Sequence, residues 1–517
     1  MNAIRCHRSD DVAVVLQTLE PGDEIVIDDD VRPEDGRPLV AAERIPQLHK
    51  VAIRVIGQGE PVKRYGRTIG RATQAIEPGQ WVHLHNIESQ LASVIDRREM
   101  ESRIEQMRDD PLSVGSIEVT PPARNRFAGY VRPDGRVGTR NEIWILPLVG
   151  CVNRTAEQLA CAVRPTLPET VDAVRVWSHP YGCSQLGEDH EATRTILARL
   201  ARHPNAAGVL LLGLGCENNT LESFLPLLGT DCDDLPIRAL VCQEVEDELT
   251  EGRRILDSLI EQASAAKRES VSIDRLTVGL KCGGSDALSG VTANPLLGRI
   301  SDRLVAARGR VILTETPEMF GAEEGLLRRS ASAEIFDRSL EMLQGFRDHF
   351  TQHGQPVGEN PSPGNQEGGI TTLEEKSLGC VMKGGDGPVV DVLPYGGQIP
   401  SNVDRPGVVL LDGPGNDMVA VTALAAAGAQ IVLFTTGRGT PLGGPVPTLK
   451  IASGSDLARQ KRHWIDFDAG RALADRTLDE LADELIDLLL DTAEGVPARN
   501  ETTGHSEIAI WRRGVTL

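Results

Sequence analysis

The sequence predicts an α/β protein in which a small β-rich N-terminal domain precedes two α/β domains with mainly parallel sheets. The chain has 517 residues, enough for roughly three domains of about 150 residues each, and its apolar content of 40% suffices for ordinary cores. Short β-type runs fill the first part, whereas farther on strand-like runs alternate with amphipathic helical segments. This alternation is typical of parallel sheets, because helices connect their strands.

The N-terminal domain is expected over residues 1–95. Runs such as EIVIDD, KVAIRVI and WVHLHN are separated by Pro-Gly or Gly turns, which is the pattern of short strands joined by tight turns. Residues 96–126 are charged, contain three prolines and show no sustained periodicity, so they are predicted to be a linker.

Two α/β domains are expected after the linker, over residues 127–355 and 356–517. In the first, strands such as AGVLLLG alternate with helices such as HEATRTILARLARH, whose apolar residues recur at helical spacing. The loose stretch PVGENPSPGNQEGG sets the boundary between the two domains. In the last domain, DMVAVTALAAAG and QIVLF are predicted to be a helix and a strand, and TLDELADELIDLLLDTA the closing helix.

The charge and the cysteine usage exclude several classes of function. A net charge of −21 argues against a nucleic-acid or an anionic-membrane partner, because both require a basic surface. Nine cysteines in so long a chain, with no signal-like N-terminus, indicate a reducing compartment, so a cytoplasmic protein is expected. An acidic substrate would need local cations to overcome the overall negative field.

Three cysteines mark the ends of strand-like runs. Cys183, Cys216 and Cys282 each lie where an apolar run breaks into a polar, glycine-marked turn. Four iron-compatible ligand types lie in or near the same turns: His179, Asp189, His190 and Glu217. Because the carboxyl ends of parallel strands face one crevice, the three thiols are predicted to meet at a single iron or substrate. Other cysteines are expected to be small buried residues: Cys151, Cys161, Cys232 and Cys380.

Glycine-rich segments supply candidate groups for binding a polyhydroxy carboxylate. GYVRPDGRVGTRN offers arginines, whose guanidinium groups match a carboxylate in bidentate geometry. KCGGSDALSGVTANP lies at a turn into a helix, where free N–H groups attract anions. No GxxxxGK[ST] or strand-linked GxGxxG motif supports nucleotide binding. From these and two later glycine-rich segments, the predicted substrate-binding residues are Arg132, Arg140, Asn141, Ser285, Asn294, Lys383 and Arg438.

Nearly the whole chain resembles the altronate and galactarate dehydratase family of sugar-acid hydro-lyases, to which the sulfolactate sulfo-lyases are also similar. The resemblance rests on long motifs in order: HKVA, YGRTIGRA, GRVGTRNE, SHPYGCSQLG, GLGCENN, KCGGSDALSGVTANP, ENPSPGNQEGGITTLEEKSLG and FTTGRGTP. GPGND stands where APGND is expected, which bears only on local packing. The resemblance implies that the N-terminal domain is of the SAF type.

Within this family, WVHLHN and PEMFGAE are more similar to the altronate branch. The resemblance therefore implies dehydration of D-altronate to 2-dehydro-3-deoxy-D-gluconate in hexuronate catabolism, with iron as the usual metal. Iron would help to remove the proton beside the carboxylate and to expel the neighbouring hydroxyl. We expect Cys183, Cys216 and Cys282 to hold either Fe²⁺ or an iron–sulfur cluster, with Mn²⁺ as the alternative ion.

The general acid or base is predicted to be His49, from an N-terminal domain that closes over the crevice, with Lys281 and Asp286 as competitors. Two alternatives keep the scaffold and change the substrate, to galactarate or to sulfolactate. An alternative of another class is a sensor that binds a sugar acid without turning it over and needs no metal. A homo-oligomer is the default expectation.

Overall fold

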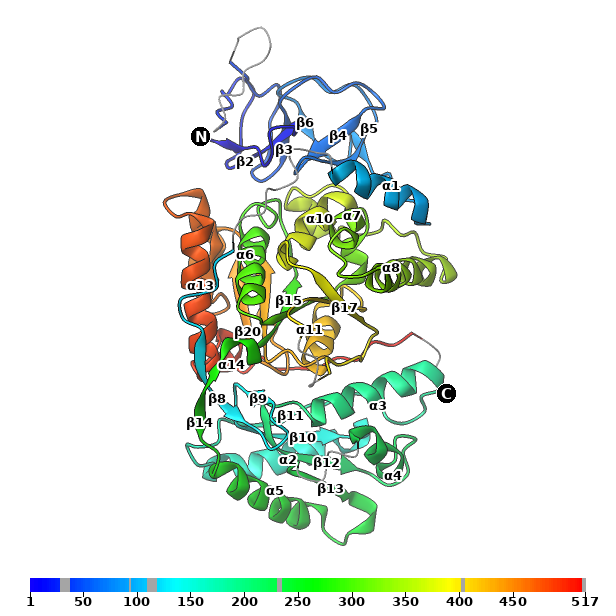
Figure 1. Ribbon diagram of the computed structural model, residues 1–517, viewed down its shortest axis with the longest axis vertical. Coiled ribbons are helices and arrows are strands. Elements are labelled where there is room, and N and C mark those ends of the chain that lie inside the picture. The colour runs from blue at the N-terminus through cyan, green and yellow to red at the C-terminus, as the bar shows by residue number, and fades with distance from the viewer. Residues whose placement is uncertain (28–37, 93, 109–118, 230–234, 401–404, 514–517) are drawn as a thin grey trace.

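The computed structural model describes residues 1–27, 38–92, 94–108, 119–229, 235–400 and 405–513. It consists of three domains stacked along the long axis (Figure 1). The N-terminal domain lies at one end, a domain built on a seven-stranded sheet lies in the middle, and a domain built on a four-stranded sheet lies at the other end. Among the described residues, no helix combines the length and the apolar character needed to cross a membrane.

The N-terminal domain is built from short antiparallel strands, as predicted for a β-rich module. One sheet has the order β1-β2-β3-β6 and the other the order β4-β5-β7. The strands are β1 (Ala3–Ile4), β2 (Val12–Val15), β3 (Lys50–Ala52), β4 (Pro61–Arg64), β5 (Arg67–Ala72), β6 (Trp81–Val82) and β7 (Ile87–Glu88).

The predicted linker contains a helix, α1 (Arg97–Arg108). Met100 and Ile104, four residues apart on one face of this helix, are buried against the core of the middle domain. Because most other positions in this helix are charged, its apolar stripe is too narrow to give a clear helical signal in the sequence. Residues 109–118 of the predicted linker lie outside the described residues.

The second domain carries a parallel sheet in the order β11-β10-β12-β13, as strand and helix alternation predicted. The strands are β10 (Glu142–Pro147), β11 (Val174–Val176), β12 (Ala206–Gly213) and β13 (Ile237–Val241). Its helices are α2 (Asn153–Val163), α3 (Gly187–Ala201), α4 (Leu221–Phe224) and α5 (Glu248–Ser264). A small antiparallel sheet of β8 (Arg126–Val131), β9 (Val137–Gly138) and β14 (Arg268–Ser272) joins this domain to the next.

The C-terminal domain has a seven-stranded sheet in the order β17-β18-β16-β15-β19-β20-β21, and all of its pairings are parallel. The strands are β15 (Thr277–Cys282), β16 (Arg310–Leu313), β17 (Val389–Leu393), β18 (Gly407–Leu411), β19 (Ile431–Thr436), β20 (Thr448–Ala452) and β21 (Phe467–Asp468).

Helices of the C-terminal domain cover both faces of this sheet. They are α6 (Ala293–Ala306), α7 (Glu323–Leu327), α8 (Ala333–Gln352), α9 (Pro363–Glu367), α10 (Leu373–Val381), α11 (Asp417–Ala426), α12 (Ser455–Gln460), α13 (Leu478–Ala493) and α14 (Arg499–Thr503). The predicted helix and strand in DMVAVTALAAAG and QIVLF are α11 and β19. The predicted closing helix is α13, which starts with a capping box between Thr477 and Glu480.

The boundary between the two α/β domains lies earlier than predicted. Strands β15 and β16 belong to the seven-stranded sheet, so the boundary falls between α5 and β15 rather than at residue 355. β15 pairs with β19, whose residues follow about 150 positions later, and such a long-range pairing leaves no trace in local periodicity. The loose stretch around residues 356–369 is a connection within one domain.

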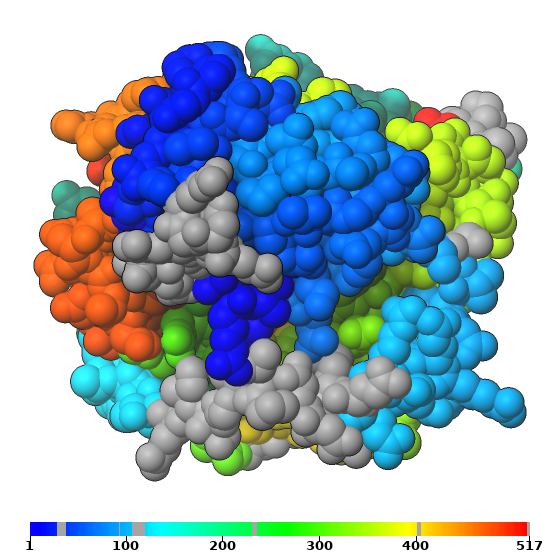
Figure 2. All heavy atoms as spheres, turned by 90° about the horizontal axis from the view of Figure 1, so that it is seen from above, coloured from blue at the N-terminus to red at the C-terminus, as the bar shows by residue number. Residues whose placement is uncertain are grey.

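The two ends of the seven-stranded sheet face different domains (Figure 1). At the amino end of β19, the carbonyl oxygen of Ala429 accepts a hydrogen bond from His203 of the second domain at 3.1 Å. At the carboxyl end, the N-terminal domain docks on α9, α10 and the loop after β15, and Figure 2 shows this domain (blue) covering much of that face. Ligand sites in parallel sheets form at the carboxyl end, so the N-terminal domain covers the expected site.

Candidate active site

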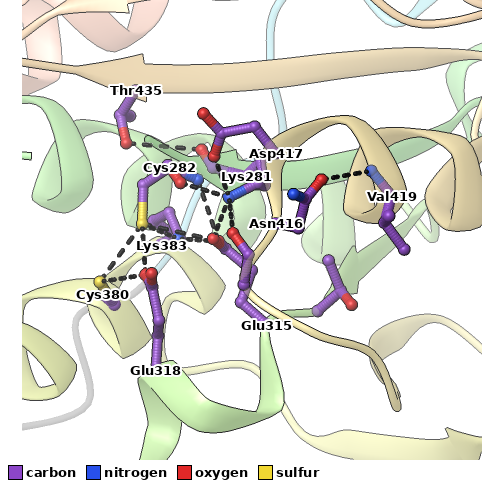
Figure 3. A network of polar contacts seen from close by, with 12 residues as sticks. Lys281, Cys282, Glu315, Glu318, Cys380, Lys383, Asn416, Asp417, Val419 and Thr435 are labelled. Carbon is purple, nitrogen blue, oxygen red and sulfur yellow. Dashed lines mark hydrogen bonds and ion pairs between the residues drawn. The ribbon is translucent and has the colours of Figure 1, made fainter. Parts of the chain in front are cut away.

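The carboxyl edge of the seven-stranded sheet carries a cluster of thiols, carboxylates and ammonium groups (Figure 3). The chain runs from β15 to β16 and β18 on one side and returns to β19 on the other side of β15. In open α/β sheets, ligands usually bind at such a change of direction. Cys282, the last residue of β15, lies at this point.

Cys282, Glu318 and Cys380 point toward one another and form a compact triangle (Figure 3). The two Sγ atoms are 3.2 Å apart, and Glu318 Oε2 is 3.2 Å from each of them. All three residues are buried. They come from β15, the turn after β16 and α10, so the fold rather than local sequence brings them together.

Three lysines lie around this triangle: Lys281, Lys376 and Lys383. Lys383 Nζ lies 2.7 Å from Cys282 Sγ and 2.9 Å from Glu315 Oε2, and Lys376 Nζ lies 2.8 Å from Glu318 Oε1. Burial disfavours charge on these groups, but opposite charges outweigh it, so the pKa of Glu318 is lowered and that of Lys376 is raised. These groups therefore remain ionised at neutral pH.

The charges of the cluster leave room for a divalent cation. Three carboxylates balance three ammonium groups as long as both thiols keep their protons: Glu315, Glu318 and Asp417 against Lys281, Lys376 and Lys383. Loss of both thiol protons would leave a charge of −2, which a divalent ion would neutralise. Two soft thiolates and one carboxylate are a donor set that iron accepts. The residues present therefore fit an iron site.

His49 lies at the seam between the N-terminal domain and this edge. Its Nδ1 accepts a hydrogen bond from Trp81 Nε1 at 3.1 Å, and its Nε2 lies 3.2 Å from the carbonyl oxygen of Glu367 in α9. Burial lowers the pKa of His49 below its ordinary value of 6.5. The imidazole is therefore neutral at pH 7, with its proton on Nε2 facing Glu367, and Nδ1 acts as a base only when a substrate proton replaces the N–H of Trp81.

The two competing acid–base candidates are held differently. Lys281 pairs with Glu315 and with Asp417, and although burial opposes its charge, these carboxylates raise its pKa, so it stays an ammonium group. The Asp286 carboxylate accepts hydrogen bonds from Ser289 and Ser453, and burial raises its pKa. Asp286 joins the loops after β15 and β20, whereas the ammonium group of Lys281 is bound by Glu315, Asp417 and the carbonyl of Cys282.

Three of the predicted substrate-binding residues lie at this edge. Lys383 belongs to the cluster, and Arg438 follows β19 and is partly exposed, with Glu367 as its ion-pair partner at 3.2 Å. The buried hydroxyl oxygen of Ser285 has no hydrogen-bond partner in the protein, so it is available to a ligand. Asn294 instead braces the fold, because it donates to the carbonyl of Gly379 and accepts from the Thr435 hydroxyl.

Arg132, Arg140 and Asn141 lie before β10, near the junction of the second and C-terminal domains, and their contacts argue against the predicted substrate role. Arg140 pairs with Glu501 and donates to backbone carbonyls of the C-terminal domain. Arg132 donates to Asn141, to the carbonyl of Arg140 and to that of Pro204. These side chains hold the junction together. The sequence does not distinguish them from ligand-binding residues, because a glycine-rich turn at the amino end of a strand looks the same as one at the carboxyl end.

The three predicted thiol ligands do not form one compact group. Cys183 and Cys216 are exposed in loops of the second domain, whereas Cys282 is buried at the far end of the seven-stranded sheet. Within the described ranges, the group of ligand atoms close enough for one ion is Cys282, Glu318 and Cys380. The prediction assumed that β12 and β15 share one sheet, and they do not.

The remaining cysteines also depart from expectation. Cys380 is buried as predicted, but it is a member of the cluster rather than a packing residue. Cys151 and Cys161 are exposed, contrary to the prediction that they are buried, and Cys232 lies outside the described residues.

A cavity of about 1000 Å³ lies between the N-terminal domain, α1 and α7. No residue of the Cys282, Glu318 and Cys380 group lines it.

Comparison with known families agrees with this domain arrangement. The families described as Altronate/galactarate dehydratase SAF domain, D-galactarate dehydratase/Altronate hydrolase second domain, and D-galactarate/Altronate dehydratase C-terminal match residues 1–90, 129–264 and 273–516. The chain belongs to the altronate/galactarate dehydratase family. The last two matches meet between α5 and β15, where the structure places the boundary.

Individual members of the altronate/galactarate dehydratase family align along nearly the whole chain. Altronate dehydratase of Escherichia coli (strain K12) is 44% identical over 100% of both chains, and altronate dehydratase of Bacillus subtilis (strain 168) is 44% identical over 99% of both. Galactarate dehydratase (L-threo-forming) of Escherichia coli (strain K12) is 32% identical over 95% of this chain and 92% of its own length.

Proposed function

We propose that this protein is a hydro-lyase that converts D-altronate into 2-dehydro-3-deoxy-D-gluconate and water, a step of hexuronate catabolism. The observation that carries the proposal is end-to-end similarity to two altronate dehydratases at 44% identity, against 32% to a galactarate dehydratase. The buried cluster at the carboxyl edge of β15 supplies the cations and the acid–base groups that such a reaction needs.

We further propose that Cys282, Glu318 and Cys380 hold iron as Fe²⁺, with Mn²⁺ as the alternative ion. The spacing of these donor atoms and the charge balance of the cluster support this assignment. A divalent iron, when bound, withdraws electron density from the carboxylate and hydroxyl oxygens of a sugar acid, which makes the neighbouring C–H more acidic.

The protein's own groups account for binding and proton transfer. Lys383 stays protonated and attracts the substrate carboxylate, and the Ser285 hydroxyl is free to bond a substrate hydroxyl. Neutral His49 takes the proton from C2 as the C2–H electron pair forms the C2=C3 bond and the C3–O bond breaks, and the imidazolium returns this proton to the departing hydroxide, which leaves as water. The resulting enol then rearranges to the 2-keto product. The N-terminal domain limits the access of bulk water to this edge.

A substrate panel tests the proposal. Under anaerobic, iron-replete conditions, we expect 2-keto acid to form from D-altronate with a kcat/KM at least about tenfold above that for galactarate or sulfolactate. A preference for galactarate or sulfolactate would replace the substrate assignment. Saturable binding of D-altronate with no product would instead support the sensor class.

His49→Gln is expected to lower kcat by about 10²- to 10⁴-fold, because the residue that removes the C2 proton is lost. In the wild-type enzyme kcat should rise with pH through the pKa of His49, which burial places below 6.5, and this acid limb should vanish in the variant. His85→Gln is the control, because His85 is an exposed histidine of the same domain. A His49→Gln enzyme with the wild-type pH profile would rule out His49 as the base.

We also propose that the protein is cytoplasmic and forms a homo-oligomer. All eight cysteines among the described residues are free thiols, which suits a reducing compartment. Symmetric assembly is the common state of soluble enzymes of this size, and light scattering of the purified protein measures it.

A further inference from the structure

The second domain presents four cysteines along a single edge of its sheet. The strands β11, β10, β12 and β13 lie side by side in that order, and a cysteine follows each of them at or near the carboxyl end. The four residues, in the same spatial order, are Cys183, Cys151, Cys216 and Cys242. Cys151, Cys183 and Cys216 are exposed, and Cys242 is partly buried. Free exposed thiols are reactive and are usually avoided on protein surfaces, so three at one sheet edge indicate a ligand site.

Direct hydrogen bonds join the loops that carry these thiols. The backbone N–H of Ser184, next to Cys183, donates to Asn218 Oδ1 at 2.8 Å, two residues from Cys216. The N–H of Asn219 donates to the carbonyl of Gly182 at 3.0 Å. The Cys183 and Cys216 loops therefore meet across the end of β10, although their strands are not adjacent in the sheet.

The loop that carries Cys151 joins the same group. The N–H of Gly150 donates to the carbonyl of Tyr181 at 2.8 Å, and Asn219 Nδ2 donates to the carbonyl of Leu148 at 3.1 Å. Each of these bonds links the end of β10 to one of the other two loops. The Cys242 side differs, because there the contact is from the side chain of Gln243, whose Nε2 donates to Cys216 Sγ at 3.7 Å.

Buried polar side chains hold these loops in shape. The Glu217 carboxylate accepts hydrogen bonds from the N–H groups of Leu214 at 3.0 Å and Gly215 at 2.6 Å, and it is only 5% exposed. His179 Nε2 donates to the carbonyl of Pro147 at 2.8 Å while its Nδ1 accepts from the N–H of Tyr181. His179 and Glu217, two of the four iron-compatible residues of these turns, thus have their polar atoms committed to the loops.

The backbone beside Cys183 is strained. Ser184 has φ 57°, in the left-handed region that non-glycine residues seldom adopt, and it lies between Gly182 at φ 99° and Gly187 at φ 53°. Such strain is concentrated at ligand-binding and functional sites. The exposed thiol of Cys183 lies directly beside this strained position.

We propose that Cys151, Cys183 and Cys216 bind an iron–sulfur cluster at the surface of the second domain. This site is separate from the group of side chains formed by Cys282, Glu318 and Cys380. A single ion with metal–sulfur bonds of about 2.3 Å would hold its thiolates within about 4 Å of one another. Within the described residues, these three cysteines are not among the groups whose ligand atoms all lie within 4.8 Å. A cluster places several irons and sulfides between its thiolates, so it suits the wider spacing.

The separation from the active site follows from the sheet directions. The second domain adjoins the amino end of the seven-stranded sheet, whereas Cys282 lies at the carboxyl end. No step of the proposed dehydration involves the surface thiols, and the inference holds whichever sugar acid is the substrate. Three protein thiolates leave one iron of a four-iron cluster open to a further ligand.

Iron, acid-labile sulfide and the visible spectrum of the full-length protein test the inference. The protein is purified anaerobically and incubated with iron salts, sulfide and a thiol reductant, and the excess is then removed. We expect the wild type to carry labile sulfide and a broad visible absorbance that dithionite bleaches. Cys183→Ser, Cys216→Ser and Cys151→Ser should lose both signals, with circular dichroism reporting that each variant is folded.

Two control variants separate this site from other thiols. Cys161→Ser, which alters an exposed cysteine on α2, and Cys282→Ser, which alters the buried cluster, should both keep the labile sulfide. Iron or zinc bound without sulfide, or labile sulfide that disappears in Cys282→Ser but persists in Cys183→Ser and Cys216→Ser, would overturn the inference.

Discussion

Replacing Cys282 by serine is expected to lower the turnover of D-altronate at least about 100-fold and to weaken the binding of Fe²⁺ in parallel. Cys282 Sγ lies at the centre of the site, 3.2 Å from Cys380 Sγ and from Glu318 Oε2 and 2.7 Å from Lys383 Nζ. A serine hydroxyl keeps the size of the side chain, but it is a poor ligand for iron because it is far less acidic than a thiol. Turnover and chelator competition measure the two effects.

Companion variants of the same cluster sharpen this prediction. Cys380→Ser and Glu318→Gln should act in the same direction, because each removes one donor of the same triangle. Cys161→Ser should leave turnover and Fe²⁺ affinity unchanged, since Cys161 is exposed on another domain. Full turnover and unchanged iron affinity in Cys282→Ser would refute the assignment. Equal losses in Cys183→Ser would restore the three-thiol site expected from the sequence.

The local elements of this fold could be predicted from the sequence, whereas the domain boundary could not. Helices α3, α6 and α13 bury one face, so their apolar residues recur at helical spacing and identify them. The pairing of β15 with β19 depends on residues far apart in the chain, which no local pattern records. Without this pairing, Cys282 is assigned to the same sheet as Cys183 and Cys216, and this assignment gives the three-thiol hypothesis.

Only the part of the candidate site that depends on local signals could be predicted from the sequence. Cys282 and Lys383 were found because strand ends and glycine-rich turns are local signals. Cys380 was missed as a ligand because it lies inside a short helix, where a cysteine resembles any small buried residue. The neighbouring charges Glu374, Glu375 and Lys376 give no signal in the sequence, because only the structure shows that they are buried and therefore need partners.

Glu375→Gln is expected to loosen the N-terminal domain by about 3–5 kcal/mol, because it leaves two buried cations without their counter-charge. Glu375 in α10 pairs with Lys50 at 2.9 Å and with Arg64, and all three side chains are at most 1% exposed. Burial alone would raise the pKa of Glu375, but Lys50 and Arg64 outweigh it and lower the pKa to about 2. Hydrogen exchange of β2 and β3, compared with that of α13, measures the opening of this domain.

The charges of Lys50, Arg64 and Glu375 determine which variants serve as controls. The trio carries two cations and one anion, so Glu375→Gln leaves two uncompensated cations, whereas Lys50→Met leaves a balanced Arg64 and Glu375 pair and should cost far less. Glu20→Gln removes one member of an exposed ion pair with Arg44 in the same domain and should cost less than about 1 kcal/mol.

Because the folded pKa of Glu375 lies below its ordinary 4.5, its contribution to the stability of this domain is complete above pH 4.5 and is lost as the pH falls toward 2. The difference between wild type and Glu375→Gln should therefore narrow below pH 4.5. Equal losses in Lys50→Met and Glu375→Gln would show that packing, and not the charge of Glu375, holds this domain over the candidate active site.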